Sequence, residues 1–219
     1  GMITIIGRPS AGKSTLMNTI CGQKISIVSP IPQTTRRAIR GIVNEERGQI
    51  VFIDTPGYHT SEKKLNRYLT EVTEESLGEG DGILYLLDST RKPGEEETRI
   101  CGLVRPLSDQ LVIAMTKIDD PRSNREGCAA FISANLGSAP VHAVSSVSGE
   151  GLTELISAIF TLLPESPPLY PEEFYTDQEP SFRIAEIIRE KAISYTREEV
   201  PHAVFVDVAD LELRREGKE

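Results

Sequence analysis

Residues 7–14 place two glycines, a lysine and a serine at the spacing of a phosphate-binding loop. They spell Gly-Arg-Pro-Ser-Ala-Gly-Lys-Ser and fit the pattern G-x-x-x-x-G-K-[ST], directly after an apolar run and directly before a helical pattern, as the motif requires. Glycines let the backbone turn tightly, so that loop amides and the start of the helix face phosphate oxygens. A turn that only caps a helix is the weaker alternative. The predicted phosphate-binding residues are Gly7, Ser10, Ala11, Gly12, Lys13, Ser14 and Thr15.

A second motif, Asp-Thr-Pro-Gly, occupies residues 54–57 at the end of the apolar run 50–53. Ligand sites in nucleotide-binding sheets form at the carboxyl ends of strands, so we expect Asp54 to lie beside the phosphate-binding loop. Its carboxylate can hold a water of a bound Mg²⁺, and the N–H of Gly57 is left free to approach a γ-phosphate. Asp and Pro-Gly are also common in ordinary turns, so the motif alone is a weak signal. Its position directly after a strand is what indicates a nucleotide-binding site.

Two further strand ends carry groups that can read a purine base. Thr116-Lys117-Ile118-Asp119 follows the buried run 111–115, and the Asp119 carboxylate can accept from the N1–H and the exocyclic amine of guanine. Adenine presents an acceptor at N1, and each polar group left unpaired costs about 1 to 3 kcal/mol, which is enough to decide between bases. Ser145 and Ser146 end the next strand, where a backbone N–H can donate to guanine O6. The sequence therefore predicts a guanine-nucleotide site.

In this order and at strand ends, the four motifs match the GTP-binding domains of translation-factor-like GTPases. Four segments resemble the Era family of ribosome-associated GTPases more closely: Gly-Gln-Lys-Ile-Ser-Ile at 22–27, Pro-Gln-Thr-Thr-Arg at 32–36, residues 54–57, and Ile-Ala-Glu-Ile-Ile-Arg-Glu-Lys at 184–191. The resemblance runs from about residue 3 to residue 208. It implies a GTPase domain joined to a C-terminal KH domain that binds RNA near the 3′ end of small-subunit ribosomal RNA.

The resemblance also implies roles for single residues. One of Thr34 and Thr35 in switch I coordinates Mg²⁺ and senses the γ-phosphate, and we favour Thr35; switch II spans residues 54–64. Loss of the γ-phosphate removes ligands from both switch loops, which couples hydrolysis to a change of shape. The expected catalytic residues are Lys13 and Thr35, and the expected Mg²⁺ ligands are Ser14, Thr35 and Asp54.

Three positions depart from the family pattern. Tyr58 follows the switch II glycine, where GTPases with a catalytic glutamine carry that residue, so we expect slow intrinsic turnover. Ser10 replaces an asparagine that is linked in related GTPases to a bound potassium ion, so a K⁺ requirement is doubtful. Thr116 replaces the asparagine of Asn-Lys-x-Asp, and guanine selection is expected to survive through Asp119.

The predicted function is a Mg²⁺-dependent GTP hydrolase that acts as a molecular switch in small-subunit assembly, with GTP as substrate and GDP as product. The expected partners are the small ribosomal subunit and the 3′ region of its rRNA. We expect a monomer in the cytoplasm, with peripheral contact to the inner face of the cell membrane. Three alternatives stay open: a GTP-gated RNA- or ribosome-binding module with negligible intrinsic hydrolysis, another ribosome-assembly GTPase, and a P-loop ATPase or kinase.

The elements that must position these motifs alternate along the chain. The loop 44–48 between the second and third predicted strands is too short for a parallel crossover, so that pair should be antiparallel. Acids at 95–97 open a helix, where the dipole favours them, and are expected to be solvated. The prediction is an α/β P-loop NTPase fold with a six-stranded mixed sheet. Predicted strands are 3–6, 39–43, 50–53, 83–87, 111–114 and 141–144, and predicted helices are 14–21, 65–77, 95–107, 125–136 and 152–163.

Charge and proline content predict a boundary in the chain. Residues 1–164 hold 17 basic against 19 acidic side chains, whereas residues 165–219 hold 7 against 14. We therefore predict a GTP-binding domain over 1–164, a proline-rich linker over 165–180 and a partial KH-like α+β domain over 181–219. Within it, 182–199 should form a helix and 203–208 a strand. No G-x-x-G loop follows, so we expect that the RNA-binding half continues beyond this segment.

Composition excludes several other classes of protein. With 219 residues and 38% hydrophobic content, the chain can bury a sizeable core, which excludes a disordered protein. A net charge of −9 argues against sequence-independent nucleic-acid binding by bulk charge. The three cysteines show no close pair, so they are expected to be reduced and buried rather than to form disulfides or a zinc site. No apolar run approaches the roughly 20 residues that cross a bilayer, and no secretory leader is evident, as expected of a cytosolic protein.

Overall fold

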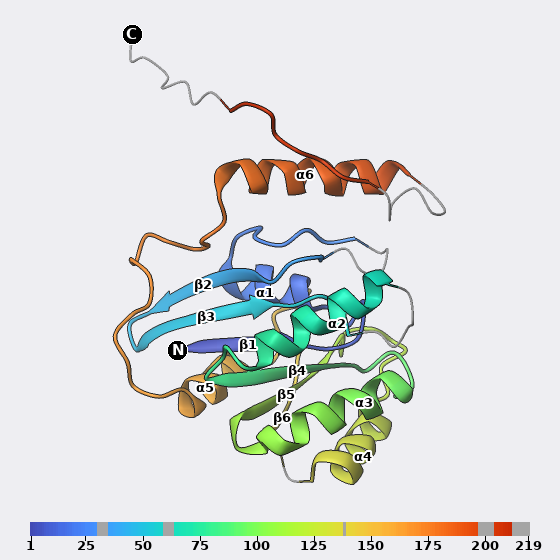
Figure 1. Ribbon diagram of the computed structural model, residues 1–219. Coiled ribbons are helices and arrows are strands. Elements are labelled where there is room, and N and C mark those ends of the chain that lie inside the picture. Colours follow the sequence, from blue (N-terminus) through green and yellow to red (C-terminus); the bar gives the residue numbers. More distant parts are fainter. Residues whose placement is uncertain (30–34, 59–63, 138, 197–203, 212–219) are drawn as a thin grey trace. The chain divides into compact units, whose positions relative to one another are not determined.

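A computed structural model describes residues 1–29, 35–58, 64–137, 139–196 and 204–211 of the chain. It divides into two compact units, Gly1–Asp177 and Gln178–Glu219. The first unit is built on one six-stranded sheet in the order β2-β3-β1-β4-β5-β6 (Figure 1). The predicted α/β fold with a six-stranded mixed sheet is confirmed.

Five strands of the sheet run parallel. Four of them, β1, β3, β4 and β5, have apolar, β-branched sequences that are almost entirely buried, as is typical of parallel sheets, whereas the short edge strand β6 is exposed to half-buried. The outermost strand is antiparallel to its neighbour, as the short loop between them predicts, and pairs Ile39 with Asp54. The parallel strands are β1 (Met2–Ile6), β3 (Gly48–Asp54), β4 (Gly82–Asp88), β5 (Leu111–Thr116) and β6 (Val141–Ala143), and the antiparallel one is β2 (Ile39–Glu45).

Helices cover both faces of this sheet (Figure 1). Helices α2 (Lys64–Leu77), α3 (Glu95–Val104) and α4 (Arg125–Leu136) lie in front of it, and α1 (Lys13–Cys21) and α5 (Leu152–Leu162) lie behind it. The predicted helix 95–107 is wrong at its end, since α3 stops at Val104 and a 3₁₀ helix follows over Arg105–Gln110. Pro106 has no N–H to donate to the preceding turn, which ends the α-helical bonding.

The segment 169–177, here called the edge segment, packs along the hairpin of β2 and β3. The amide of Ile42 donates to the Tyr175 carbonyl at 2.9 Å, and the Thr176 hydroxyl donates to the Arg40 carbonyl at 2.7 Å. Arg40 is also 3.3 Å from the Asp177 carboxylate. These contacts join much of the predicted linker to the first unit, which ends at Asp177 and not at residue 164. Composition cannot reveal these contacts, which fix the segment to β2 through one backbone hydrogen bond and through side chains.

The described residues of the second unit contain one long helix, α6 (Pro180–Tyr195), where a helix over 182–199 is predicted; residues 197–199 lie outside the described residues. Proline at its start suits the first helical turn, where an N–H has no partner in any case. The strand predicted over 203–208 is wrong for residues 204–208, which have no regular structure. A strand needs a hydrogen-bonding neighbour, and the described residues of this unit contain no strand with which this segment could pair.

Two expectations from composition can be compared with the structure. Cys101 and Cys128 are buried and Cys21 is half-buried, and all three are free thiols. In the part of the chain that the structure describes, every helix is too short or too polar to span a bilayer.

Candidate nucleotide-binding site

The predicted site residues gather at one edge of the sheet, where the parallel strands β1, β3, β4, β5 and β6 all end. The loop after β1 is followed by α1, whose N-cap Gly12 has φ +97°, a conformation that favours glycine. The first bond within the helix runs from the Leu16 amide to the Gly12 carbonyl at 2.8 Å. The amides of residues 13–15 therefore precede any intrahelical partner, and they form an anion-binding helix start.

Lys13 is folded back over this loop. Its Nζ donates to the carbonyls of Gly7 at 3.0 Å and Arg8 at 3.1 Å. Burial lowers the pKa of Lys13 to about 8, and the charge of Asp54 only partly opposes that effect. The ammonium is thus held at the loop with less than its full electrostatic stabilisation, and phosphate oxygens would supply the missing negative charge.

Three oxygen-bearing side chains from three segments meet beside Lys13. The Ser14 hydroxyl donates to Asp54 Oδ2 at 2.7 Å, and Ser14 Oγ lies 3.1 Å from Thr35 Oγ1. Adjacent ligands of an octahedral Mg²⁺ with bonds of 2.0–2.1 Å lie about 2.9 Å apart, so the hydroxyl separation suits two neighbouring ligands. The alternative residue, Thr34, lies outside the described residues.

The Asp54 carboxylate carries an unused acceptor at this point. Its Oδ2 accepts from Ser14 and, at 2.8 Å, from the hydroxyl of Ser26. Its Oδ1 is buried without a hydrogen-bond partner among the described residues. Burial raises the pKa of Asp54, although Lys13 and the two hydroxyls oppose this effect. A buried carboxylate with a free oxygen, next to two hydroxyls, is a donor set that fits Mg²⁺ and its water.

Ser26 is a member of this site that the motifs do not reveal. Asn18 on α1 holds it in place, because the Asn18 side-chain oxygen accepts from the amides of Ile25 and Ser26, both at 2.9 Å. The Asn18 amide group also donates to the Ser26 carbonyl at 2.7 Å. The segment 22–27 signals only a family resemblance, and no spacing rule connects Ser26 with a carboxylate 28 positions away.

Switch II begins in close contact with the phosphate-binding loop. A Cβ on Gly57 would stand 2.7 Å from the Pro9 Cα, so only glycine allows this approach. The next residue, Tyr58, donates its amide to the Gly7 carbonyl at 3.1 Å, and its side chain is buried in the core with Ile6 and Tyr85. The phenol at the position of a catalytic glutamine is therefore packed into the protein interior.

The predicted base-reading loops are fastened to the phosphate-binding loop. The Thr116 hydroxyl donates to the Ala11 carbonyl at 2.8 Å, and Lys117 Nζ donates to the Ser10 carbonyl at 2.8 Å. Asp119 follows in the turn after β5 and is exposed, as a residue that meets a base must be before binding. Its side chain is therefore open to solvent at the edge where the strands end.

The second predicted base-reading loop is ordered by the side chain of one of its own residues, Ser145. The Ser145 hydroxyl accepts from the amides of Val147 at 3.1 Å and Ser148 at 3.0 Å. Thr19 on α1 donates to the Ser146 carbonyl at 3.1 Å. Helix α1 therefore contacts both loops. Its first residues, up to Thr15, belong to the phosphate-binding loop, and Thr19 one turn later contacts the Ser145–Ser146 loop.

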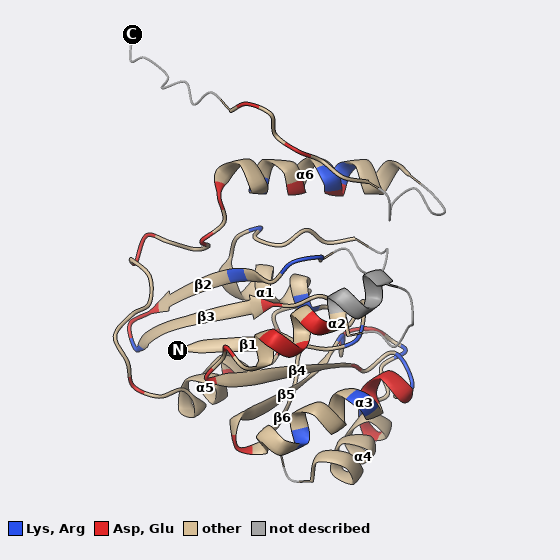
Figure 2. Ribbon diagram, in the orientation of Figure 1, with Lys and Arg blue, Asp and Glu red and all other residues tan. Residues whose placement is uncertain are grey.

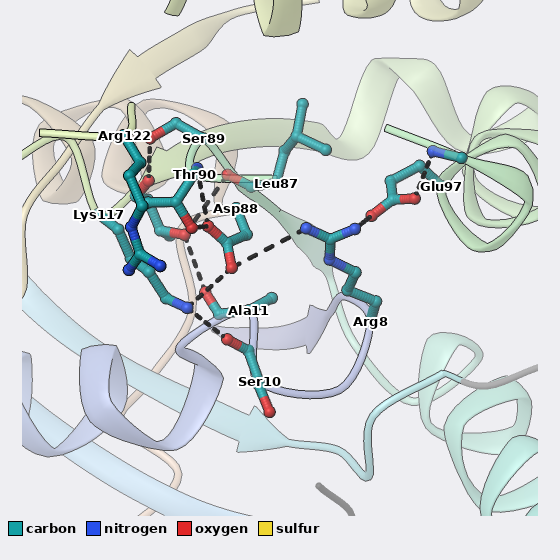
Figure 3. A network of polar contacts seen from close by, with 12 residues as sticks. Arg8, Ser10, Ala11, Leu87, Asp88, Ser89, Thr90, Glu97, Lys117 and Arg122 are labelled. Carbon is teal, nitrogen blue, oxygen red and sulfur yellow. Dashed lines mark hydrogen bonds and ion pairs between the residues drawn. The ribbon is translucent and has the colours of Figure 1, made fainter. Parts of the chain in front are cut away.

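A buried charge cluster under the loop was missed by the sequence analysis (Figure 3). Asp88, the last residue of β4, accepts from Lys117 Nζ at 2.8 Å, and Arg8 Nη1 lies 2.6 Å from Glu97 Oε1. The expectation of solvated acids at 95–97 is wrong for Glu97, which is 1% exposed and faces the buried Arg8 as its ion-pair partner. A carboxylate ending a parallel strand, the criterion that identifies Asp54, would also have found Asp88.

Comparisons with known proteins agree with this geometry. Residues 2–117 match the model of a family described as 50S ribosome-binding GTPase. GTPase Era of Treponema denticola is 54% identical over all of this chain and 76% of its own length. GTPase Era of Borreliella burgdorferi strain ZS7 is 44% identical over 98% of this chain and 74% of its own.

Solved structures give the same result. A tyrosine-to-alanine variant of Aquifex aeolicus Era bound to GDP and AlF₄⁻ superposes with a TM-score of 0.85 at 35% identity, over 92% of this chain and 69% of that one. Era in complex with MgGDPNP and nucleotides 1506–1542 of 16S ribosomal RNA also has a TM-score of 0.85, at 34% identity over the same shares. At these identities the likeness extends to sequence as well as fold.

Proposed function

The chain belongs to the Era family of GTPases, and from this premise we propose that it is a Mg²⁺-dependent GTP hydrolase that acts as a switch in small ribosomal subunit assembly. Its enzyme class, hydrolysis of GTP to GDP and phosphate, follows from the family. The single observation that supports the cofactor and mechanism is the meeting, at one edge of the sheet, of Lys13, Ser14, Thr35 and an Asp54 Oδ1 that has no partner among the described residues.

Each residue of this group has a distinct role in the proposed mechanism. Lys13 and the amides at the start of α1 bind the terminal phosphates and stabilise the charge that grows on them as water attacks in line. Ser14 and Thr35 supply hydroxyl ligands and Asp54 holds a bound water, so that Mg²⁺, when present, neutralises charge on the β- and γ-phosphates. No side chain forms a covalent intermediate in this scheme.

Guanine selection is proposed to depend on Asp119. In this scheme its carboxylate, which is exposed, accepts from the two N–H groups on the guanine edge, a pair that adenine does not offer. Lys117, held between Asp88 and the Ser10 carbonyl, fixes the loop from which Asp119 projects. A backbone N–H of the Ser145–Ser146 loop donates to guanine O6 in the same scheme.

The second unit is proposed to bind the 3′ region of small-subunit rRNA. The support is the solved Era complex with nucleotides 1506–1542 of 16S rRNA, which matches 92% of this chain and 69% of its own chain. The charge on α6 does not by itself suggest RNA, because acidic and basic residues mix along the helix (Figure 2). Arg189 also pairs with Glu186 at 2.6 Å. Recognition is therefore assigned to the family's RNA-binding domain as a whole.

The burial of Tyr58 favours a second candidate function, a GTP-gated RNA- or ribosome-binding module with negligible hydrolysis on its own. A phenol in the core cannot orient the attacking water in the way that a mobile amide side chain does. Hydrolysis would then depend on groups that a partner orders or supplies. We also propose that the protein is a cytoplasmic monomer with peripheral membrane contact, and that it does not require K⁺.

Multiple-turnover phosphate release distinguishes the two functions. The full chain is incubated with Mg²⁺ and GTP, with and without small ribosomal subunits, and with ATP as the control nucleotide. Steady release from GTP alone supports the hydrolase, whereas release only with subunits supports the gated module. Equal release from GTP and ATP would contradict both proposals.

A further inference from the structure

Three buried charged side chains from three separate segments lie together beneath the phosphate-binding loop (Figure 3). Arg8 belongs to the loop, Asp88 ends β4 and Glu97 lies in the first turn of α3, and they are 4%, 0% and 1% exposed. A buried charge costs several kcal/mol unless a partner compensates it. The three groups must therefore compensate one another, and each constrains where the others can lie.

Glu97 is fixed independently of Arg8. Its Oε2 accepts from the Gly94 amide at 2.8 Å, so the start of α3 sets the direction of the carboxylate. Its other oxygen, Oε1, then lies 2.6 Å from Arg8 Nη1. The guanidinium in turn brings Nη2 to 3.9 Å from Asp88 Oδ2, an ion pair without a hydrogen bond.

Asp88 divides its two oxygens between neighbouring loops. Oδ1 accepts from the amide of Thr90 at 2.9 Å and from its hydroxyl at 2.6 Å. Oδ2 accepts from Lys117 Nζ at 2.8 Å and faces Arg8. Lys117 has φ +60°, an uncommon backbone conformation for a residue with a side chain, so its loop needs such outside contacts to persist.

We propose that the buried Arg8–Glu97 pair is a positioning device for guanine discrimination, which acts by holding Asp88 where it fixes Lys117 and so the loop that carries Asp119. This inference rests on the proposed nucleotide site. Arg8 and Glu97 are enclosed by protein, and they act through Asp88 and Lys117 rather than on the nucleotide. The start of α3 is thereby linked to the choice of base, although α3 itself carries no base-reading residue.

The test compares two glutamate-to-glutamine variants in the same helical turn. Glu97→Gln keeps the shape and an acceptor for the Gly94 amide but removes the charge opposite Arg8. Glu95→Gln, at an exposed position, removes an equal charge without touching the pair. Calorimetric titration with GDP and with ADP gives the discrimination ratio of each full-length protein, and thermal unfolding is recorded in parallel.

We expect Glu97→Gln to reduce the preference for GDP over ADP at least about fivefold, the lower range of coupling between linked sites, and Glu95→Gln to leave it unchanged. Arg8→Met combined with Glu97→Gln should reduce the preference no further than Glu97→Gln alone, because the two residues act as one unit. If Glu97→Gln does not fold, Arg8→Lys, which keeps the charge but loses the planar fork, replaces it with the same expectation.

Two results would overturn the inference. A Glu97→Gln protein that melts earlier but keeps the wild-type ratio would make the pair a purely structural one. Equal losses for GDP and ADP would confine its influence to the phosphate-binding loop. A wild-type protein without any preference for GDP would instead overturn the proposed function, before a variant is measured.

Discussion

Two regions of the first unit bury polar side chains, and they do so in opposite ways. Where β3 meets the edge segment, Gln49 Oε1 accepts from the amides of Leu169 and Tyr170 at 2.8 and 3.0 Å. Its Nε2 donates to Asn44 Oδ1 at 2.7 Å and to the Tyr170 carbonyl at 2.9 Å. A side-chain amide offers two donors and two acceptor positions, so the protein itself satisfies this group completely.

At the nucleotide-binding site the buried groups are charged and incompletely satisfied. Asp54 keeps one oxygen without a partner in the described part of the chain, and burial lowers the pKa of Lys13 to about 8. Polar groups that stabilise the fold find their partners within the chain, whereas those that serve a ligand retain part of their desolvation cost until the ligand arrives. We therefore expect the protein to stay folded when a charge is removed from the nucleotide-binding site. Loss of the Gln49 side-chain amide, which holds the edge segment, should instead destabilise the fold.

The largest effect is expected for Lys13→Met. Hydrolysis of GTP should fall about 10³-fold, because removal of one charge-stabilising donor typically costs 10² to 10³ in rate. The melting temperature should stay the same or rise, since an apolar side chain replaces a buried ammonium. Single-turnover phosphate release and thermal unfolding measure the two quantities. A variant that loses activity only because it unfolds would remove the distinction between the two regions.

A smaller effect, about 100-fold, is expected for Asp119→Ala in the preference for GDP over ADP. Two hydrogen bonds to guanine are lost, at about 1 to 3 kcal/mol each. Stability should not change, because the side chain is exposed. Asp120→Ala is the matched control: the neighbouring carboxylate pairs with Arg122 at 2.7 Å and should leave the ratio intact. Competition titrations with both nucleotides provide the measurement.

Gln49→Leu tests the other region. It should lower the free energy of unfolding by about 2 kcal/mol, because it leaves amides of the edge segment and the Asn44 side chain without their partner. GDP affinity of the folded protein should match the wild type. Chemical denaturation with and without GDP measures both, and Gln110→Leu, at an exposed position, controls for the added hydrophobicity. Unchanged stability would show that water replaces these bonds at no cost.

The smallest effect concerns pH. The free protein releases the Lys13 proton near pH 8, and bound phosphate, by restoring a negative partner, raises the pKa of that ammonium. Binding must therefore take up a proton above about pH 8, and GDP affinity should fall there by up to tenfold per pH unit. Calorimetry in buffers of different ionisation heat detects this uptake, which Lys13→Met should lack. Uptake that persists in that variant would assign the proton to another group.

Much of the site follows from local sequence patterns. The phosphate-binding loop is contiguous, and Asp54 and Asp119 can be placed because each follows a strand whose apolar run is visible. The antiparallel β2–β3 pair follows from loop length alone. In each of these cases the chemistry and its position are encoded within a few residues of one another.

Long-range partners are not encoded in this way. Glu97 is an ordinary first-turn acid until folding places it 2.6 Å from Arg8, 89 positions earlier in the chain. The edge segment looks like a linker because its bonds to β2 join residues far apart in the chain, which no local pattern signals. The strand predicted over 203–208 shows the converse, since a local β-branched pattern does not form a strand without a neighbour.

The bond from the Ile42 amide to the Tyr175 carbonyl has a consequence for solubility. An uncovered outer strand is a template for pairing with strands of other molecules, and β2, with seven residues, is long enough to serve as one. The edge segment occupies part of that template, while the opposite outer strand, β6, is only three residues long. A fragment of this protein that stops at residue 164 should therefore aggregate through β2, and one that continues to Asp177 should stay dispersed.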